Sequence, residues 1–297
     1  MSHFLAERGE PVASLNACRF QSDFAAVWEG FVFKKPFVVL DFPYHPRADW
    51  WFDHHGTTFL KENWQDNFQS DRQHYLDPAY PSCYGMTLNF LKKHYQYQPS
   101  DILQELEPWA DKIDSSNYQS AEEAVSINSW IQELMLLNFS YDLIDHDGYA
   151  DLQKKIIENV AKGEIKDLLR GSYHSAVGQL KNILQQSRER YQKEAVIKGK
   201  VSFTDETGQE ILFSNFFCYS LFPELPYATY ISRGTKDFHL HIGRNPWLKP
   251  ASALNLGELM KKYGGGGHEG VGGAEAKTKE EALKIMEELI EYLNQRG

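Results

Sequence analysis

Phe52-Asp53-His54-His55 closes a hydrophobic run, and an Asp-His-His triplet in that place is typical of metal ligands. Much further along the chain, Tyr263-Gly264-Gly265-Gly266-Gly267-His268 sets four consecutive glycines before a histidine. Because glycine has no Cβ, the backbone N–H groups of such a run are open to an anion, and His268 adds a donor that can be cationic. The two stretches predict a metal centre on one domain and a phosphate-binding segment on another.

The overall composition narrows the classes of partner. A chain of 297 residues is long enough for two domains with separate cores. Its formal charge of 31 − 41 = −10 gives it no general attraction for long nucleic acids, so a small anionic substrate needs a local positive site. The three cysteines are widely spaced and form no CxxC pair, which fits a reducing compartment. No apolar run approaches the roughly 20 residues of a membrane span, and the first residues lack a signal-peptide pattern, so we expect a cytoplasmic protein with no membrane partner.

Two apolar runs near the start predict neighbouring strands of a parallel sheet. Residues 36–40 form a continuous apolar run that ends in Asp41, and residues 50–52 form another that ends in Asp53-His54-His55. In open α/β sheets the ligand site lies at the carboxyl ends of the strands. Imidazole and carboxylate donors at two such ends favour Mn, Zn, Fe or Co, and the abundance of carboxylates favours Mn.

Each of these residues also has an ordinary structural interpretation. The Asp-His-His triplet could be a solvated turn, and Asp41 alone could be a helix cap at a strand end. Further on, residues 81–184 read as mostly helical, and Asp111 and Asp114 there are three residues apart and so share a helical face. They are either a metal ligand with a supporting acid behind it or a pair of surface acids.

A second domain is expected from residue 195 onward, after a long polar helical segment. Strand-like patterns cover residues 196–201, 211–213, 227–232 and 238–242, with a hairpin turn predicted at residues 205–208, and residues 278–293 predict a closing helix. The glycine run could be a linker, but it lies between a helical segment and structured sequence, which favours a phosphate-binding loop. Arg233 and Arg244 could reach the same anion or be ordinary surface arginines. His239 and His241 share a strand face and suggest a packed pair.

The Phe52-Asp53-His54-His55 stretch combined with the Gly264–His268 stretch resembles the DHH/DHHA1 phosphoesterase family over nearly the whole chain. That resemblance implies an α/β fold with three parts: a mainly parallel-sheet DHH domain at 1–148, a helical connector at 149–194 and a smaller α/β DHHA1 domain at 195–297. The active site is expected in the cleft between the two domains. The family's oligomeric state is left open, a homodimer being one option.

The resemblance also implies roles for particular residues. Asp41, His54 and Asp111 are expected to bind Mn2+, Asp53 to orient the site and His55 to lie near the scissile phosphate. The substrate phosphate is expected at Arg244 and at the segment Gly265, Gly266, Gly267 and His268. The implied reaction is hydrolysis by a water that two metal ions activate, and the implied substrates are short oligonucleotides or nucleotide phosphates.

The sequence departs from the family pattern in the first motif. The His-x-x-x-Asp-x-Asp loop of the family is not found before residues 1–9, which resemble the helix that should follow it. We therefore expect either a chain that starts too late or a natural protein with a reduced site, in which one metal ion could take the place of two. A milder departure is Val271-Gly272-Gly273, where the family usually has Ala-Ala-Gly. Two alternatives stay open: an exopolyphosphatase or pyrophosphatase, and a non-catalytic nucleotide-binding protein.

Overall fold

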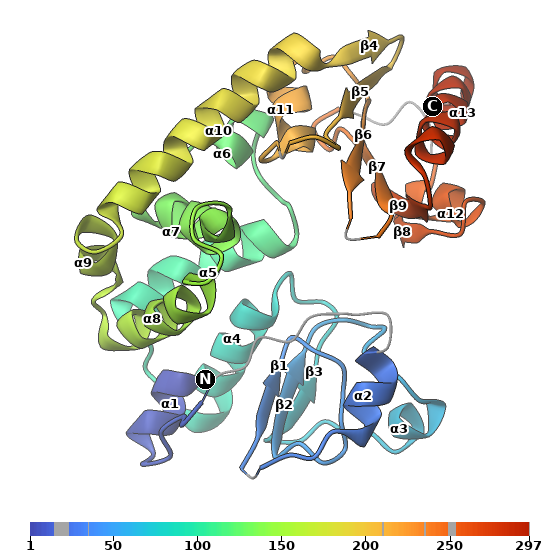
Figure 1. The fold of residues 1–297 in the computed structure, drawn as a ribbon. Coiled ribbons are helices and arrows are strands. Elements are labelled where there is room, and N and C mark those ends of the chain that lie inside the picture. Colours follow the sequence, from blue (N-terminus) through green and yellow to red (C-terminus); the bar gives the residue numbers. More distant parts are fainter. Residues whose placement is uncertain (15–23, 35, 210, 235, 249–253, 297) are drawn as a thin grey trace. The chain divides into compact units, whose positions relative to one another are not determined.

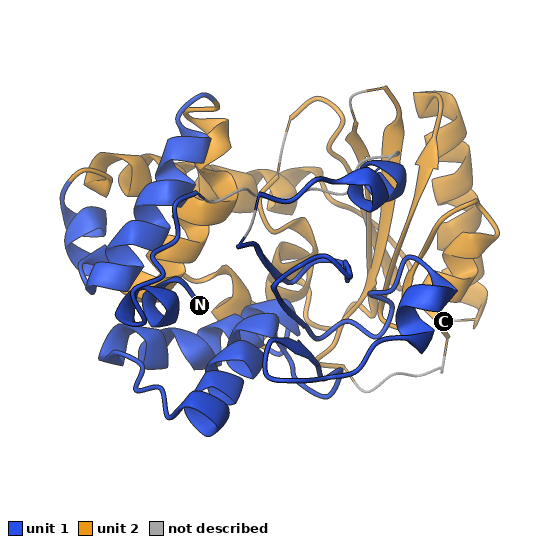
Figure 2. Ribbon diagram, turned by 90° about the horizontal axis from the view of Figure 1, so that it is seen from below, with its two compact units in different colours: residues 1–117, 147–171 blue, residues 118–146, 172–297 orange. Residues whose placement is uncertain are grey.

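The computed structural model describes residues 1–297 apart from 15–23, 35, 210, 235, 249–253 and 297. It separates the chain into two compact units, each built from two segments (Figure 2). Unit 1 comprises Met1–Asn117 and Asp147–Gly171, and unit 2 comprises Tyr118–His146 and Ser172–Gly297. None of the helices in the described ranges combines the length and the apolar character needed to cross a bilayer.

Unit 1 contains a three-stranded parallel sheet in the order β1-β2-β3 (Figure 1). The strands are β1 (Val38–Leu40), β2 (Trp50–Asp53) and β3 (His74–Leu76). The central strand is apolar on both faces because both faces are covered. Phe52 packs with Met86 and Leu91 of one core, and Trp51 packs with Trp28 and Val39 of another. The prediction of a buried parallel sheet is therefore confirmed.

Helices surround this sheet and present residues to the ends of its strands. Ser82 caps α4 by accepting a hydrogen bond from the backbone N–H of Gly85 at 2.9 Å. The helix α5 packs against α4. The helices of unit 1 are α1 (Ser2–Glu7), α2 (Phe24–Gly30), α3 (Glu62–Asp66), α4 (Cys83–Tyr95), α5 (Asp101–Asp114), α8 (Tyr149–Lys162) and α9 (Ile165–Arg170).

Unit 2 contains a six-stranded sheet in the order β4-β5-β6-β7-β9-β8, in which β5 and β6 are parallel and the other neighbours antiparallel. One face of this sheet packs with α12 and α13 in a core that includes Leu240, Ile242 and Met286. A second core of this unit includes Tyr191 and Phe217. Its strands are β4 (Val196–Lys198), β5 (Val201–Asp205), β6 (Tyr227–Arg233), β7 (Phe238–Arg244), β8 (Gly266–His268) and β9 (Val271–Ala276). Its helices are α6 (Ala121–Val125), α7 (Trp130–Ser140), the 3-10 helix η1 (Tyr141–Leu143), α10 (His174–Glu194), α11 (Ser214–Leu221), α12 (Leu256–Lys261) and α13 (Lys279–Arg296).

Two local expectations differ from the structure of unit 2. The hairpin predicted around residues 205–208 is wrong: β4 and β5 turn at Gly199, and the chain after β5 leads into α11. Residues 211–213 are apolar because Ile211 packs in the core beside Phe217 and Leu212 and Phe213 pack against that core. The glycine run is not wholly a loop, since its second half forms β8 at the sheet edge.

Candidate metal centre and phosphate site

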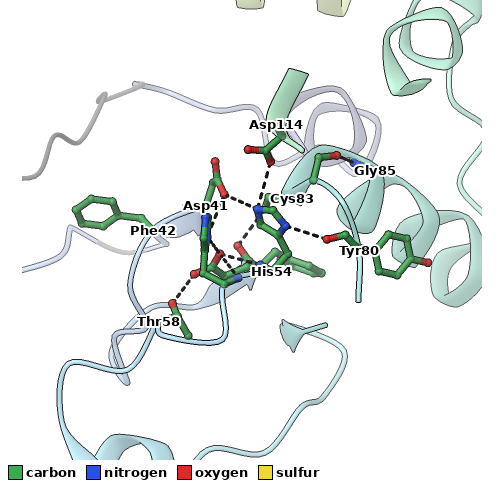
Figure 3. A network of polar contacts seen from close by, with 12 residues as sticks. Asp41, Phe42, His54, Thr58, Tyr80, Cys83, Gly85 and Asp114 are labelled. Carbon is green, nitrogen blue, oxygen red and sulfur yellow. Dashed lines mark hydrogen bonds and ion pairs between the residues drawn. The ribbon is translucent and has the colours of Figure 1, made fainter. Parts of the chain in front are cut away.

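Asp53 organises the turn that follows β2. Its side chain is buried, and its Oδ1 accepts hydrogen bonds from the backbone N–H groups of His54 at 2.7 Å and His55 at 3.1 Å. The same oxygen lies 2.7 Å from Nδ1 of His55, and Oδ2 accepts a hydrogen bond from Thr58 (Figure 3). Both carboxylate oxygens are thus engaged within the turn. Asp53 therefore holds the turn that carries the two histidines.

The imidazole nitrogen Nε2 of His54 faces two carboxylates. Its Nδ1 lies 3.0 Å from the carbonyl oxygen of Tyr80, and because a carbonyl only accepts, Nδ1 must carry the proton. Its Nε2 is buried and has no hydrogen-bond partner in the described part of the chain. That atom lies 3.2 Å from Oδ2 of Asp114 and 3.7 Å from Oδ1 of Asp41 (Figure 3). In the neutral ring this nitrogen carries a lone pair, and a cation placed between it and the two carboxylates would bind all three groups.

Asp41 reaches this place through an unusual backbone conformation. Its φ is 55°, in the left-handed region that few residues other than glycine, Asn and Asp adopt. Its backbone N–H still donates to the carbonyl of Phe52 at 3.0 Å, so the turn begins directly at the end of β1. Partial burial, followed by the negative charge of Asp114, raises the pKa of Asp41. Crowded acids of this kind favour the binding of a cation.

His55 is the exposed member of the group. Partial burial lowers its pKa, but the hydrogen bond to Asp53 and the charges of Asp53, Asp41 and Asp114 outweigh this, and the pKa of His55 is raised overall. Its Nδ1 points to Asp53 at 2.7 Å. A side chain in this position can donate a hydrogen bond or a proton to a bound anion.

The two acids of α5 have different neighbours. Asp111 accepts a hydrogen bond from Ser82, the residue that caps α4, whereas Asp114 lies against His54. Sequence periodicity places both on one helical face but does not say which of the two is nearer the histidine. Asp114, taken from the sequence as a supporting acid behind Asp111, thus contacts His54 directly.

The donor set fits a divalent metal ion. Donor atoms of Asp41, His54 and His55 all lie within 4.8 Å of one another. Carboxylates with neutral imidazole suit Mn, Zn, Fe or Co, and a ligand histidine commonly donates its other N–H to a backbone carbonyl, as His54 does to Tyr80. Residue types alone gave no signal for Tyr80, since it acts through its backbone.

In unit 2, the glycine run packs closely on its neighbours. A Cβ on Gly265 would collide with the carbonyl of Gly273, and one on Gly267 would collide with the carbonyl of Val271. Gly267 also has a φ of 146°, which favours glycine. The run is therefore glycine-rich for packing reasons, and the backbone N–H of Gly265 donates to the carbonyl of Met260 at 3.1 Å. His268, at its end, is exposed on the edge strand β8.

Arg244 lies beside this run. Its backbone N–H donates to the carbonyl of Gly270 at 2.9 Å, and its Nη2 donates to Oε1 of Glu269 at 2.9 Å. Its Nη1 is buried without a hydrogen-bond partner among the described residues. The structure therefore brings Arg244 next to the turn that joins β8 and β9, and it leaves a guanidinium donor there for an anion.

Comparison with solved structures defines the class of fold: the chain has the DHH/DHHA1 phosphoesterase fold, as the sequence resemblance predicts. It is similar over its whole length to the pGpG-specific phosphodiesterase PggH from Vibrio cholerae, with 20% identity, a TM-score of 0.73 and coverage of 95% of that chain. An exopolyphosphatase-related protein from Bacteroides fragilis matches 86% of this chain and 71% of its own at 13% identity and a TM-score of 0.41. No protein-family model matches the sequence, and no curated protein matches it.

Proposed function

We propose that this protein is a metal-dependent phosphoesterase that hydrolyses phosphoester bonds of short oligonucleotides or nucleotide phosphates. The observation that carries the proposal is the buried Nε2 of His54, which faces the carboxylates of Asp41 and Asp114 and has no hydrogen-bond partner among the described residues. The fold, shared with a pGpG-specific phosphodiesterase, agrees with this chemistry. The proposal assigns metal binding to unit 1 and phosphate binding to unit 2.

In unit 1, Asp41 and His54 are proposed to hold the metal, with Mn2+ as the proposed ion. The third ligand is proposed to come from α5, where Asp114 contacts His54 and Asp111, the ligand expected from the sequence, is bonded to Ser82. When bound, the ion supplies positive charge for the phosphoryl oxygens and lowers the pKa of a coordinated water. Asp53 holds the turn, and His55 is proposed to donate a hydrogen bond to the scissile phosphate.

In unit 2, the substrate's phosphate is proposed to bind at Gly265, Gly266 and Gly267, with the imidazole of His268. Nη1 of Arg244, which has no hydrogen-bond partner among the residues that the structure describes, supports this assignment, because a buried guanidinium N–H without an acceptor costs free energy that an anion would offset. We carry over as proposals the DHH domain at 1–148, the connector at 149–194 and the DHHA1 domain at 195–297.

A nucleotide is favoured over polyphosphate by one observation in unit 2. The polar face of the sheet carries stacked rings: Tyr230 and His241 have centroids 4.3 Å apart and planes at 14°. Rings of this kind stack with nucleobases, whereas a polyphosphate site calls for a row of cations. The substrate class proposed is therefore a short oligonucleotide rather than a chain of phosphates.

The test is Mn2+-dependent release of mononucleotide from pGpG by the full chain. We expect turnover to fall roughly 100-fold or more in His54→Ala. Mutation of residues that only hydrogen-bond to metal ligands already lowers metal affinity or activity by about 10–100-fold. His146→Ala, which changes an exposed histidine in unit 2, is the matched control and should keep wild-type turnover. Binding of pGpG without turnover in the wild type would instead identify a non-catalytic nucleotide-binding protein.

A further inference from the structure

A row of ring side chains crosses the polar face of the sheet in unit 2 and stops at a glycine. The register pairs Tyr230 of β6 with His241 of β7, and His241 with Gly273 of β9. Neighbouring strands lie about 4.8 Å apart, and the rings of Tyr230 and His241 stack at 4.3 Å. The next place in the row, above Gly273, has no side chain.

The missing ring leaves room for a ligand. A cavity of about 680 Å³ is lined by His239 and His241 of β7, by Gly273 and Glu275 of β9, and by Tyr263 beside the glycine run, among others. A Cβ on Gly273 would lie 4.0 Å from Nδ1 of His241 and 3.2 Å from the backbone carbonyl oxygen of Leu240, so the space on the side of the His241 ring is open. A planar ring placed there would continue the stack at the spacing that Tyr230 and His241 already have.

His241 is suited to stacking against a neutral heterocycle. Burial, followed by the charge of His239, lowers the pKa of His241 to about 4. Its imidazole is therefore uncharged at neutral pH. His239, two residues earlier on β7, lies nearly parallel to it at 17° and completes a flat wall.

One edge of the cavity offers a carboxylate. Glu275 pairs with His239 across β7 and β9, and its Oε1 lies 4.0 Å from Nδ1 of His239. Within the described ranges no group donates a hydrogen bond to Glu275, whose side chain is 66% exposed. Asp237 is engaged instead, its Oδ1 lying 3.2 Å from Nε2 of His239. A ligand with N–H donors on its edge would find a free acceptor in Glu275.

The opposite edge leads to the proposed phosphate site. On β8 and β9, Gly266 pairs with Gly273 and His268 pairs with Val271, and Gly265 lines the cavity itself. Three positions follow one another along β9 at intervals of two residues, about 7 Å each. They are the position opposite His268, the position above Gly273, and Glu275. In a nucleotide the phosphate, the base ring and the hydrogen-bonding edge of the base follow one another in the same order.

We infer that the cavity above Gly273 is a guanine-binding slot, in which the base stacks on His241 and Glu275 accepts hydrogen bonds from its edge. Among the common bases, guanine places a ring N–H and an amino group side by side, so one carboxylate can accept from both. Adenine and cytosine offer only the amino group, and uracil only a ring N–H. The inference rests on the proposed function in taking the ligand to be a nucleotide.

The experiment measures binding of 5′-GMP, 5′-IMP, 5′-AMP and 5′-UMP to the full chain by calorimetry with EDTA present. Because no metal and no hydrolysis are needed, its result is separate from the pGpG turnover assay. Wild type should bind GMP about tenfold or more tighter than IMP, which lacks the amino group, and tighter than AMP or UMP. Glu275→Gln should weaken GMP binding about tenfold or more and leave AMP binding unchanged, whereas Glu287→Gln, on an exposed face of α13, should match wild type.

A second variant tests the stacking position. Gly273→Val should weaken all four nucleotides, with the melting temperature as the check on folding. An unchanged preference for GMP in Glu275→Gln overturns the inference, and so does full nucleotide binding by a folded Gly273→Val. Donor atoms of Asp237, His239 and Glu275 also lie within 4.8 Å of one another. A GMP preference that appears only when Mn2+ replaces EDTA would show that recognition of the base needs a bound cation, and would likewise overturn the inference.

Discussion

Nε2 of His54 lies 3.2 Å from Oδ2 of Asp114, the last residue of α5. In the neutral ring that donates through Nδ1 to the carbonyl of Tyr80, Nε2 brings a lone pair to this contact. Two acceptors at this separation repel each other. A positive charge removes this repulsion, and either a second proton on the ring or a divalent ion between the two atoms supplies it.

We therefore expect Asp114→Asn to weaken Mn2+ binding by roughly 10–100-fold, the range found for residues that support a metal site. Isothermal titration of the full chain with Mn2+ measures this. Asp101→Asn, at the other, exposed end of α5, is the matched control and should bind like wild type. Asp111→Asn is the informative companion: a larger loss there than in Asp114→Asn would make Asp111 the α5 ligand, as expected from the sequence.

Asp53→Asn should destabilise unit 1. The carboxylate accepts from two backbone N–H groups and the His55 ring through Oδ1 and from Thr58 through Oδ2, whereas the asparagine side chain keeps only one accepting oxygen and carries no charge. Hydrogen bonds to a buried charge contribute about 1.5–3 kcal/mol each, so we expect a loss of about 2–4 kcal/mol in the free energy of unfolding. Urea unfolding measures it. Asp66→Asn on α3 should change little, and equal stability of the two variants would show that Asp53 does not organise the turn.

The sequence predicted the features that depend on local pattern. Continuous apolar runs identified β1 and β2, and the residue types at their ends identified Asp41, His54 and His55, which the structure brings together. Helix periodicity could not rank Asp111 against Asp114, because the choice depends on how α5 packs on α4. The hydrogen bond from His54 to Tyr80 involves a backbone carbonyl, which any residue type would supply. The ring row of Tyr230 and His241 needed the strand register, which the sequence does not give.

Two neighbouring glycines of the run, Gly265 and Gly266, should respond differently to replacement by alanine. Gly265→Ala should cost about 1–3 kcal/mol of unfolding free energy, because its Cβ would collide with the backbone of Gly273 and Ala274 and force β8 away from β9. Gly266→Ala should be nearly neutral, since a Cβ there meets nothing within 4 Å. Thermal unfolding of the two variants beside wild type measures the difference. Equal melting temperatures would mean that β8 is not packed on β9 as described.

The stability of unit 2 should depend on pH through Glu206. This carboxyl is buried after β5 and accepts a hydrogen bond from Thr204 at 3.0 Å. Burial raises its pKa from 4.5 to about 7, so the folded state binds the proton more tightly than the unfolded state. The resulting contribution, up to about 3 kcal/mol, is fully present below pH 4.5 and is lost as the pH rises through about 7.

Urea unfolding at a series of pH values between 4.5 and 8 measures this contribution. Glu206→Gln keeps an acceptor for Thr204 but has no charge to bury, so its unfolding free energy should fall less than that of wild type over this range. The difference in unfolding free energy between the two proteins should therefore be smallest at low pH and largest above pH 7, where Glu206→Gln should be the more stable protein. Glu287→Gln should follow the wild-type curve. A wild-type curve parallel to that of Glu206→Gln throughout would show that folding does not raise the pKa of Glu206.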